Sequence, residues 1–497
     1  MGRKISKKIK KIVFFKPYNE VPSDSLRRLL TPLGLLYIAA VLEKEGYDVA
    51  VIDSQCEGYD NIVEKDGYIR YGLSDDDVIK RIQEENPDII CVGVSFSDQE
   101  KIIVDTCKVL KKSKPGALIV LGGIHPTFFP KRMLEKIPEA DFVIMGEGEY
   151  RTRDLLNAIN NGRDYGEHDG LAFRKNGEIV VNPAKKNIEN LDDIPFPARH
   201  LVDMEKYISV NIGLSPYPRK DRVEQILTSR GCPFHCFFCS SSAFWGHTFR
   251  QRSVDNVIAE MRLLKEKYKI EEIQFTDDNI SLKRKWIVEL CERMKEFNFV
   301  WSTPTGIMMK TLDEDVIKLM AESGCYQLTF SIESANQRVL DHIIHKPLDL
   351  KIVKPLIDAS HKYGISIHTN NIIGMPGEKK EEMMRTFEFN KEVGADSAAF
   401  FIPIPLPGSD LYKQCIEKRW INNDQNKIDL KHVSIKIRET DPEYIMPAKE
   451  IEELVDRKTK EHNEWSKKKN PERWEEKFRQ FLKKHKDQGD KIIGRVT

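Results

Sequence analysis

The sequence predicts an α/β protein: a doubly wound parallel sheet, then a partial (β/α)6 barrel, then a charged helical C-terminal segment. Short apolar runs alternate with amphipathic helical stretches from residue 10 to about 160, and a second such series begins near Val223. Residues between the two series carry a hairpin signal and two prolines. We therefore expect a first domain at 8–164, a hairpin and linker at 165–200, the barrel at 201–422 and the helical region at 423–497.

The first series predicts five buried strands joined by helices. Helices are expected over 33–46, 74–85 and 98–112, where Gly46 is a stop signal and Ser74 a start signal. Strands alternating with helices in this way form a parallel sheet, and ligands of such sheets lie beyond the carboxyl ends of the strands. The expected strands are Lys10–Phe15, Asp48–Asp53, Ile89–Val94, Ala117–Leu121 and Phe142–Met145.

The linker and the second series follow the same rules. Asn176-Gly177 lies between two alternating runs, which predicts a β-hairpin. Six βα units then predict a barrel or partial barrel whose reacting groups lie on the loops after the strands. The expected strands are Val223–Ser229, Glu271–Asp277, Phe299–Thr305, Tyr326–Ile332, Ile365–Ile372 and Asp396–Pro403.

The composition excludes several classes of protein. Among 497 residues, 79 Lys and Arg against 78 Asp and Glu give a net charge of +1, which offers no basis for a nucleic-acid partner. The apolar runs are too short to span a membrane. Nine cysteines are too few and too odd for a disulfide framework, so a cytoplasmic location is expected.

Three of these cysteines stand apart from the rest. Cys232, Cys236 and Cys239 fall on a loop punctuated by glycine and proline after the first barrel strand, where packing does not require cysteine. A structural zinc site would need a fourth ligand, for which His235 or His247 is a candidate. A four-iron cluster normally takes four cysteines, so three would leave one iron open to a substrate or cofactor.

The Cys-x3-Cys-x2-Cys loop resembles that of the radical S-adenosylmethionine (SAM) superfamily, and further motifs follow in order. These are "FTDDN" (Phe275–Asn279), which departs from the family's Gly-Gly-Glu form, "SIES" (Ser331–Ser334) and "IIGMPGE" (Ile372–Glu378). The resemblance implies that the three cysteines bind a [4Fe-4S] cluster and that SAM completes its coordination. It also implies that the residues contacting SAM are Phe238, Thr276, Asp277, Asp278, Ser331, Glu333, Ser334, Gly374, Met375 and Pro376.

The first domain resembles cobalamin-binding domains. It lacks G-x-G-x-x-G and Walker loops, but small residues follow its strands, and bare backbone suits a flat ring. The Asp-x-His-x-x-Gly motif that supplies a cobalt ligand in one branch is absent, and His125 is expected to be a loop residue near the corrin. The resemblance implies cobalamin contacts from Leu33, Gly34, Ser95, Phe96, Ser97, Gly122, Gly123, His125, Gly146 and Glu147.

Together the two resemblances imply a cobalamin-dependent radical SAM methyltransferase, which would transfer the methyl group of methylcobalamin to an unactivated carbon. Oxidative cyclisation or rearrangement on the same architecture is the alternative, and a non-catalytic cobalamin or iron–sulfur sensor is a third hypothesis. We expect an electron donor such as flavodoxin or ferredoxin. The substrate is left open among a small molecule, a tetrapyrrole and a peptide.

Overall fold

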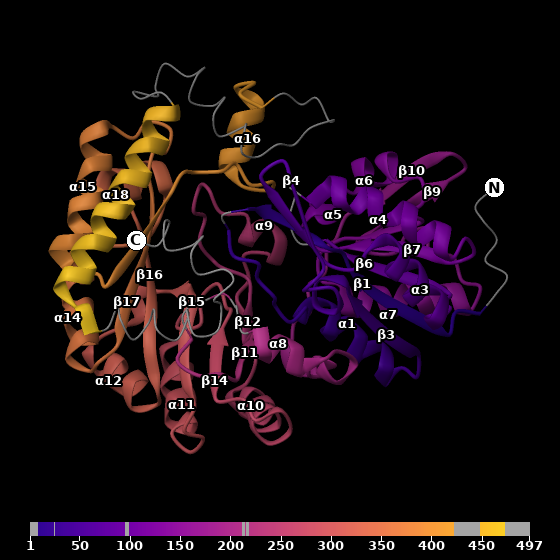
Figure 1. Cartoon of the computed structure of the whole chain (residues 1–497), viewed down its shortest axis with the longest axis horizontal. Helices are drawn as coiled ribbons and strands as arrows, with labels where there is room; N and C mark the ends of the chain where they lie inside the picture. The colour runs from indigo at the N-terminus through magenta and orange to yellow at the C-terminus, as the bar shows by residue number, and fades with distance from the viewer. Residues whose placement is uncertain are drawn as a thin grey trace. The chain divides into compact units, whose positions relative to one another are not determined.

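A computed structural model describes residues 8–23, 25–94, 99–210, 214, 218–421 and 448–472. The chain divides into two compact units, Met1–Tyr207 and Ile208–Thr497. In Figure 1 the first unit runs from indigo to purple and the second from magenta to yellow. Each unit is described by itself.

The first unit is built on a seven-stranded sheet with the order β10-β9-β8-β7-β6-β1-β3. Strands β1, β3, β6, β7 and β8 are parallel. The order reverses between β1 and β6, which confirms the predicted doubly wound sheet and places a ligand crevice at the carboxyl ends of these strands. The strands are β1 (Lys11–Lys16), β3 (Asp48–Asp53), β6 (Ile89–Gly93), β7 (Leu118–Gly122), β8 (Phe142–Ile144), β9 (Leu171–Lys175) and β10 (Glu178–Asn182).

Helices cover both faces of this sheet because successive residues of a buried strand point to opposite faces. Phe14 shares one apolar cluster with residues of α1 and α7, whereas Phe15 shares another with residues of α3 and α4. The helices are α1 (Leu33–Lys44), α2 (Ser54–Glu57), α3 (Asp75–Glu85), α4 (Glu100–Ser113), α5 (Ile124–Phe128), α6 (Pro130–Lys136) and α7 (Gly148–Asn160).

Two antiparallel additions complete the first unit. The hairpin predicted at Asn176-Gly177 forms, and its strand β9 pairs with β8, so the hairpin extends the sheet. A separate three-stranded sheet of β2 (Asn19–Pro22), β4 (Ile62–Lys65) and β5 (Tyr68–Tyr71) was not expected from the sequence. Its turn, Asp66-Gly67, has positive φ at both residues. That dipeptide is the signal that would have predicted it.

The second unit contains a six-stranded parallel sheet whose order, β11-β14-β15-β16-β17-β18, follows the sequence. Each strand is added on the same side of the one before it, as in a (β/α) barrel. The first and last strands, β11 and β18, do not pair with each other, so the barrel is open and the predicted partial barrel is confirmed. Its strands are β11 (Val223–Ile226), β14 (Glu272–Phe275), β15 (Val300–Ile307), β16 (Cys325–Glu333), β17 (Ser366–Ile372) and β18 (Ser397–Phe401).

Helices enclose the outer face of this sheet. The C-terminal helix α18 (Ala448–Lys469) packs beside β18 and α15, where Ile451 and Leu454 join Phe387 and Phe400 in one apolar cluster (Figure 1). The other helices of the second unit are α9 (Ser241–Trp245), α10 (Val254–Tyr268), α11 (Arg284–Met294), α12 (Glu314–Glu322), α13 (Gln337–Val339), α14 (Val353–Lys362), α15 (Lys380–Val393) and α16 (Asp410–Glu417). The chain passes from the first unit to the second within α8 (Met204–Val210).

Short turns connect these elements. They are 3-10 turns at Leu191–Asp193, Arg199–Leu201, Met309–Thr311 and Leu350–Ile352 and a π turn at Leu340–Ile344. Among the described helices, none combines the length and the apolar character needed to cross a membrane. A second C-terminal helix expected over 472–486 lies almost entirely outside the described residues.

Candidate functional site

The loop that carries the three cysteines is fixed at both ends. It follows β12 (Ser229–Arg230), which pairs antiparallel with β13 (Arg250–Gln251), and it leads into α9. Gly231 opens the loop with φ +88°, and a Cβ there would lie 2.3 Å from the Thr248 carbonyl oxygen. Only glycine fits this position, because both the backbone conformation and the contact exclude a side chain.

The three thiols are unoxidised and partly buried. Burial raises the pKa of Cys232 and Cys236, and it raises the pKa of Cys239 to about 11. The ammonium group of Lys346 opposes this shift in Cys232 and Cys236. Without a metal the thiols are therefore protonated at neutral pH, and binding of a metal would have to displace their protons.

Three thiols on one loop are the number that leaves one iron of a four-iron cluster without a protein ligand. A single zinc ion requires ligands within about 2.3 Å, whereas a four-iron cluster takes its thiolates at separate corners. His235 and His247, the candidate fourth ligands of a zinc site, stack on each other with ring centroids 4.0 Å apart. This arrangement does not support the zinc alternative.

Asp277, from the motif after β14, anchors the base of the cysteine loop. Its Oδ1 accepts hydrogen bonds from the Thr228 amide (3.0 Å), the Thr228 hydroxyl (2.7 Å) and the Ser229 hydroxyl (2.5 Å). Burial raises the pKa of Asp277 to about 6, although these hydrogen bonds favour the charged form. Its Oδ2 is buried without a partner. One carboxylate oxygen therefore positions the loop and the other is available to a ligand.

The rest of the same motif also reaches the loop. The Thr276 amide donates to the Ile226 carbonyl at 3.0 Å, and the Ser241 hydroxyl donates to Asp278, so the far end of the cysteine loop is tied as well. Asn279, which the sequence analysis did not single out, hydrogen-bonds the Cys232 thiol and leaves its Oδ1 buried without a partner. Its position directly after Asp277 and Asp278, two predicted site residues, is the sequence feature that could have identified it.

The motif at the end of β16 has an unusual backbone. Glu333 has φ +66°, and the pairing of β16 with β17 shifts register between Ser331 and Glu333. The Glu333 carboxylate is 8% exposed and pairs with Lys346 at 3.1 Å. Ser334 is fully buried, and its hydroxyl accepts from the Asn336 amide at 3.2 Å. The bulge therefore turns Glu333 out of the regular strand geometry and toward Lys346.

Lys346 links this motif to the cysteines. Burial lowers the pKa of its amine, but the charges of Glu333, Cys236 and Cys239 more than compensate, so the pKa is raised overall. The positive charge of Lys346 therefore interacts with all three thiols. Lys346 was missed by sequence reasoning because it follows a turn 13 residues after Glu333 and belongs to no motif.

The motif after β17 is held by a residue within it. Glu378 Oε2 accepts hydrogen bonds from the amides of Gly374 (2.7 Å) and Met375 (3.0 Å), and its Oε1 is buried without a partner. Burial raises the pKa of Glu378 to about 8. Met375 and Pro376 are buried, and the loop presents its backbone rather than charged side chains.

Phe238 lies between the last two cysteines but packs against the chain after β18. It joins an apolar cluster with Leu411, Cys415 and Trp420. The loop backbone makes the same connection, since the Leu411 amide donates to the Phe237 carbonyl at 2.9 Å. The ring of Phe238 therefore serves loop packing in this structure.

The predicted cobalamin residues of the first unit lie at the carboxyl ends of β6, β7 and β8 and at the start of α1. Gly123 has φ +112°, and a Cβ there would lie 2.3 Å from the Val94 carbonyl oxygen. Gly123 is therefore required by the close approach of the Val94 backbone, and the cobalamin contacts of Gly122 and Gly123 stay a prediction. A Cβ at Gly34 would meet no atom within 4 Å. Leu33 is partly buried against an apolar cluster that includes Tyr37 and Val41 of α1. Ser95, Phe96 and Ser97 lie outside the described residues.

His125 is fully buried beside a charged group. Its Nε2 lies 3.1 Å from Glu100 Oε2, which also accepts from Arg132 Nε at 2.7 Å. Burial by itself would raise the pKa of Glu100. The hydrogen bonds from His125, Arg132 and Lys136 stabilise the charged carboxylate more strongly and hold its pKa below the ordinary value. Because Glu100 uses this nitrogen, His125 Nε2 is not presented to a metal.

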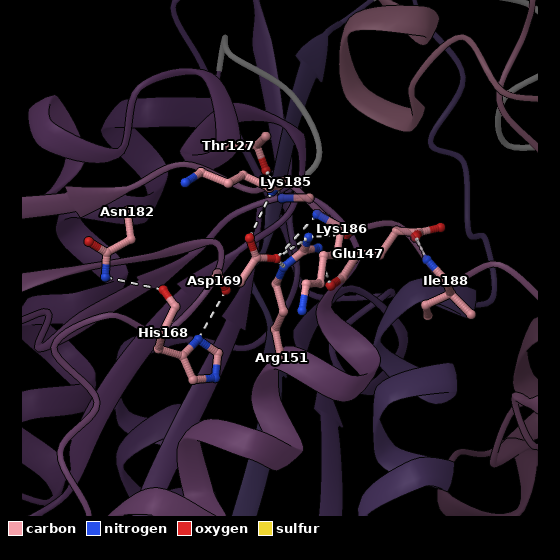
Figure 2. A network of polar contacts seen from close by, with 10 residues as sticks. Thr127, Glu147, Arg151, His168, Asp169, Asn182, Lys185, Lys186 and Ile188 are labelled. Atoms are coloured by element: carbon pink, nitrogen blue, oxygen red, sulfur yellow. Dashed lines mark hydrogen bonds and ion pairs between the residues drawn. The ribbon is translucent and has the colours of Figure 1, made fainter.

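Glu147 takes part in a network around Arg151 that binds the linker (the segment 165–200) to α7 (Figure 2), and the neighbouring Gly146 amide donates to the Thr127 hydroxyl at 2.9 Å. The Glu147 carboxylate accepts the Ile188 amide at 2.6 Å, and Arg151 Nη1 donates to the Glu147 carbonyl at 2.8 Å. Arg151 also binds Asp169 at 2.8 Å. The Glu147 side chain is therefore engaged with main chain of the linker.

Family models match both units. The Radical SAM superfamily model matches residues 226–389, and the B12 binding domain model matches residues 23–156. The first region contains the cysteine loop and the strands from β14 to β17, and the second contains the strands from β3 to β8. The families and the geometry thus agree on a [4Fe-4S] cluster, SAM and cobalamin as cofactors.

Relatives cover nearly the whole chain. Cytidylyl-2-hydroxyethylphosphonate methyltransferase of Streptomyces wedmorensis is 37% identical over 86% of this chain and 85% of its own length. Anaerobic magnesium-protoporphyrin IX monomethyl ester cyclase of Rubrivivax gelatinosus is 27% identical over 82% of this chain and 70% of its own.

A solved structure shares the fold. The radical SAM methyltransferase TsrM of Kitasatospora setae, with tryptophan and a SAM analogue bound, superposes with a TM-score of 0.67 at 18% identity, covering 82% of this chain and 76% of that one. Radical SAM enzymes use a reductant, so this one requires a source of electrons. The chain belongs to the cobalamin-dependent radical SAM enzymes, in the branch that contains the methyltransferases.

Proposed function

We propose that this enzyme methylates an unactivated carbon atom of its substrate. The observation that carries the proposal is the loop of three thiols, tied at both ends to the motif after β14, on a chain whose first unit matches the B12 binding domain model. When bound, the cluster with SAM would supply a carbon radical, and cobalamin would supply the methyl group.

Different residues of the second unit would hold the cluster and the separate parts of SAM. Cys232, Cys236 and Cys239 would bind three irons. Asp277 and Asp278, together with the neighbouring Asn279, would receive the amino group of SAM. The turn at Glu333 and Ser334 would contact its ribose, and the backbone of Gly374–Pro376 would lie along the adenine, where Glu378 holds the loop in shape.

In the first unit we assign the cobalamin slot to the ends of β6 and β7 and the start of α1. Gly122 and Gly123 follow β7, where Gly123 lets the Val94 backbone approach closely, and Leu33 and Gly34 lie at the uncapped N-terminus of α1. His125 would lie near the corrin as a structural residue, since Glu100 engages its Nε2. Gly146 and Glu147 complete the assignment, and Ser95, Phe96 and Ser97, which lie outside the described residues, stay a prediction.

For the electron donor we propose a flavodoxin or a ferredoxin, and a cytoplasmic location stays a prediction. Because the relative from Streptomyces wedmorensis is named for cytidylyl-2-hydroxyethylphosphonate, this compound is the first substrate to test. It offers an unactivated carbon next to a hydroxyl group.

The test is anaerobic reconstitution with iron, sulfide and hydroxocobalamin, followed by assay with SAM and a reductant. We expect S-adenosylhomocysteine, 5′-deoxyadenosine and a product heavier by one methylene unit. The variant with Cys232, Cys236 and Cys239 replaced by alanine should fold, bind cobalamin and form none of these products. Release of 5′-deoxyadenosine without any S-adenosylhomocysteine would overturn methyl transfer.

The cyclase relative favours a second candidate, oxidative ring formation by the same architecture. Its product would be lighter than the substrate by two hydrogen atoms and would need no methyl donor. The mass of the product therefore separates the two candidates directly.

A further inference from the structure

The outer side of the cysteine loop is exposed, although the thiols themselves are partly buried. Pro233 and His235 are exposed just before Cys236. His247 and Thr248 are exposed after α9, and the rings of His235 and His247 stack with centroids 4.0 Å apart. These four residues therefore form one continuous surface, which we call the loop face, beside a thiol that would bind the cluster.

The stretch of chain that forms the loop face carries no negative charge. Between Glu224 and Asp255 the sequence has no acidic residue, and its charged side chains are three arginines, Arg230, Arg250 and Arg252. All three are largely buried, and Arg252 pairs with Glu260 of α10 at 2.5 Å. A negatively charged group that approaches the loop face is therefore not repelled by any side chain of this stretch.

Exposed lysines extend this surface. Lys283 Nζ lies 5.6 Å from the ring centroid of Phe249, the residue after Thr248. Lys285, at the start of α11, is also exposed, and neither lysine forms an ion pair within the part of the chain that the structure describes. Arg284 differs from them, because its guanidinium binds Asp313 at 2.7 Å. Two uncompensated positive charges thus lie beside the loop face.

We propose that the loop face, together with Lys283 and Lys285, binds the electron donor, and that this donor is a small acidic one-electron carrier protein. The proposal rests on the proposed function and names the surface at which its reductant binds. In the step itself the carrier is oxidised by one electron and the cluster is reduced by one. No bond is made or broken and no proton moves.

The position and the size of this surface support a carrier protein. Electron transfer slows steeply with distance, so the carrier has to approach the cluster where the protein layer over it is thinnest, and here a single loop separates Cys236 from solvent. Transient electron-transfer complexes bury less than about 1,200 Å², which a loop and one helix end can supply. Two lysines would raise the rate of encounter with an acidic partner, and salt would weaken the effect.

A first experiment measures reduction of the cluster in the reconstituted enzyme by photoreduced flavodoxin, without substrate. Rapid freezing and electron paramagnetic resonance follow the reduced cluster. The double variant Lys283→Glu/Lys285→Glu should lower the second-order rate constant about tenfold at low ionic strength, and added salt should shrink the difference. Its iron content should be unchanged. Reduction by the methyl viologen radical, which needs no protein surface, should not be slowed.

Lys267→Glu/Lys269→Glu is the matched control. It makes the same change in charge at exposed positions, but these lie where α10 ends and β14 begins, at the opposite end of the barrel from the cysteine loop. It should be reduced by flavodoxin at the wild-type rate. Equal slowing in both double variants, no slowing in either, or equal slowing with methyl viologen overturns the proposal.

A second experiment locates the carrier directly. A carbodiimide joins lysine amines to carboxylates in contact with them, and mass spectrometry identifies the linked peptides. We expect flavodoxin to be linked to Lys283 or Lys285 of the reconstituted enzyme. Links formed only at other lysines would show that the carrier binds elsewhere.

These outcomes are distinguishable from failure of the proposed function, because neither experiment requires a substrate. If flavodoxin reduces the cluster through this surface but no methylated product forms from any substrate, methyl transfer is wrong and the docking surface stands. If methylation occurs and the charge variants are reduced normally, the docking surface is wrong and methyl transfer stands.

Discussion

At the scale of single residues, the site depends on buried carboxyl groups that organise backbone. Asp277 holds the start of the cysteine loop through three donors, and Glu378 holds the loop after β17 through two amides. Each keeps one oxygen buried without a partner. These two carboxyl groups therefore hold the loops after β14 and β17 in shape.

Glu378 makes stability depend on pH in a definite direction. Burial raises its pKa from 4.5 to about 8, so the folded protein favours the protonated form. That contribution is complete below about pH 4.5 and is lost as the pH rises toward 8. Glu378→Gln stays neutral at every pH, so its melting temperature relative to wild type should increase between about pH 5 and pH 8.

Thermal unfolding of the two proteins across this range checks the prediction. Asp277, whose pKa is also raised, is present in both proteins and cancels in the difference. Glu392→Gln is the matched control on α15, because hydrogen bonding to Arg385 lowers the pKa of Glu392. A pH-independent difference between wild type and Glu378→Gln would contradict the assignment of a protonated carboxyl.

At the scale of elements, the conformation of the cysteine loop is determined by the residues at its two ends. The pairing of β12 with β13 and the glycine at 231 set the direction in which the chain leaves the sheet. The thiols lie on irregular backbone, so their arrangement depends on these constraints and on the anchoring hydrogen bonds of the motif after β14.

Gly231→Ala should therefore disturb the site more than the fold. Positive φ together with a contact of 2.3 Å implies a strain of about 1–3 kcal/mol. The chain would relieve this strain by shifting the loop. We expect less iron bound per chain after reconstitution and a lower melting temperature.

Gly116→Ala is the control for this substitution, since a Cβ at Gly116 meets no atom within 4 Å. It should bind iron as the wild type does. Equal iron content in Gly231→Ala and wild type, measured by metal analysis, would show that the loop tolerates a side chain at this position.

At the scale of the whole molecule, two compact units carry two sets of cofactor residues. The cysteines lie in the unit from Ile208 onward, and the glycines of the proposed slot lie in the unit ending at Tyr207. A ligand that binds only the folded state stabilises the region that holds it. The two cofactors should thus protect different parts of the chain.

Removal of iron by a chelator should increase hydrogen exchange around residues 228–242 and the neighbouring motifs, and leave 8–164 unchanged. Omission of cobalamin should do the reverse. Hydrogen exchange measured by mass spectrometry on the reconstituted enzyme follows both regions at once. Equal loss of protection in both units after chelation alone would contradict separate sites.

The sequence alone determined the sheet, the partial barrel and the cysteine loop, because hydrophobic periodicity and local motifs are encoded in neighbouring residues. It also placed Asp277, Glu333 and Gly374 in loops after the barrel strands. The small sheet of β2, β4 and β5 was missed although Asp66-Gly67 signalled a hairpin, since β4 is exposed throughout and β2 is only partly buried, so that neither strand carries a clear apolar periodicity.

Only the tertiary structure decided which side chains meet. Lys346 pairs with Glu333, and Phe238 packs against the chain after β18. These contacts join residues on different strands and loops, and no local pattern encodes them. Register and packing fix them, and both depend on the whole chain having folded.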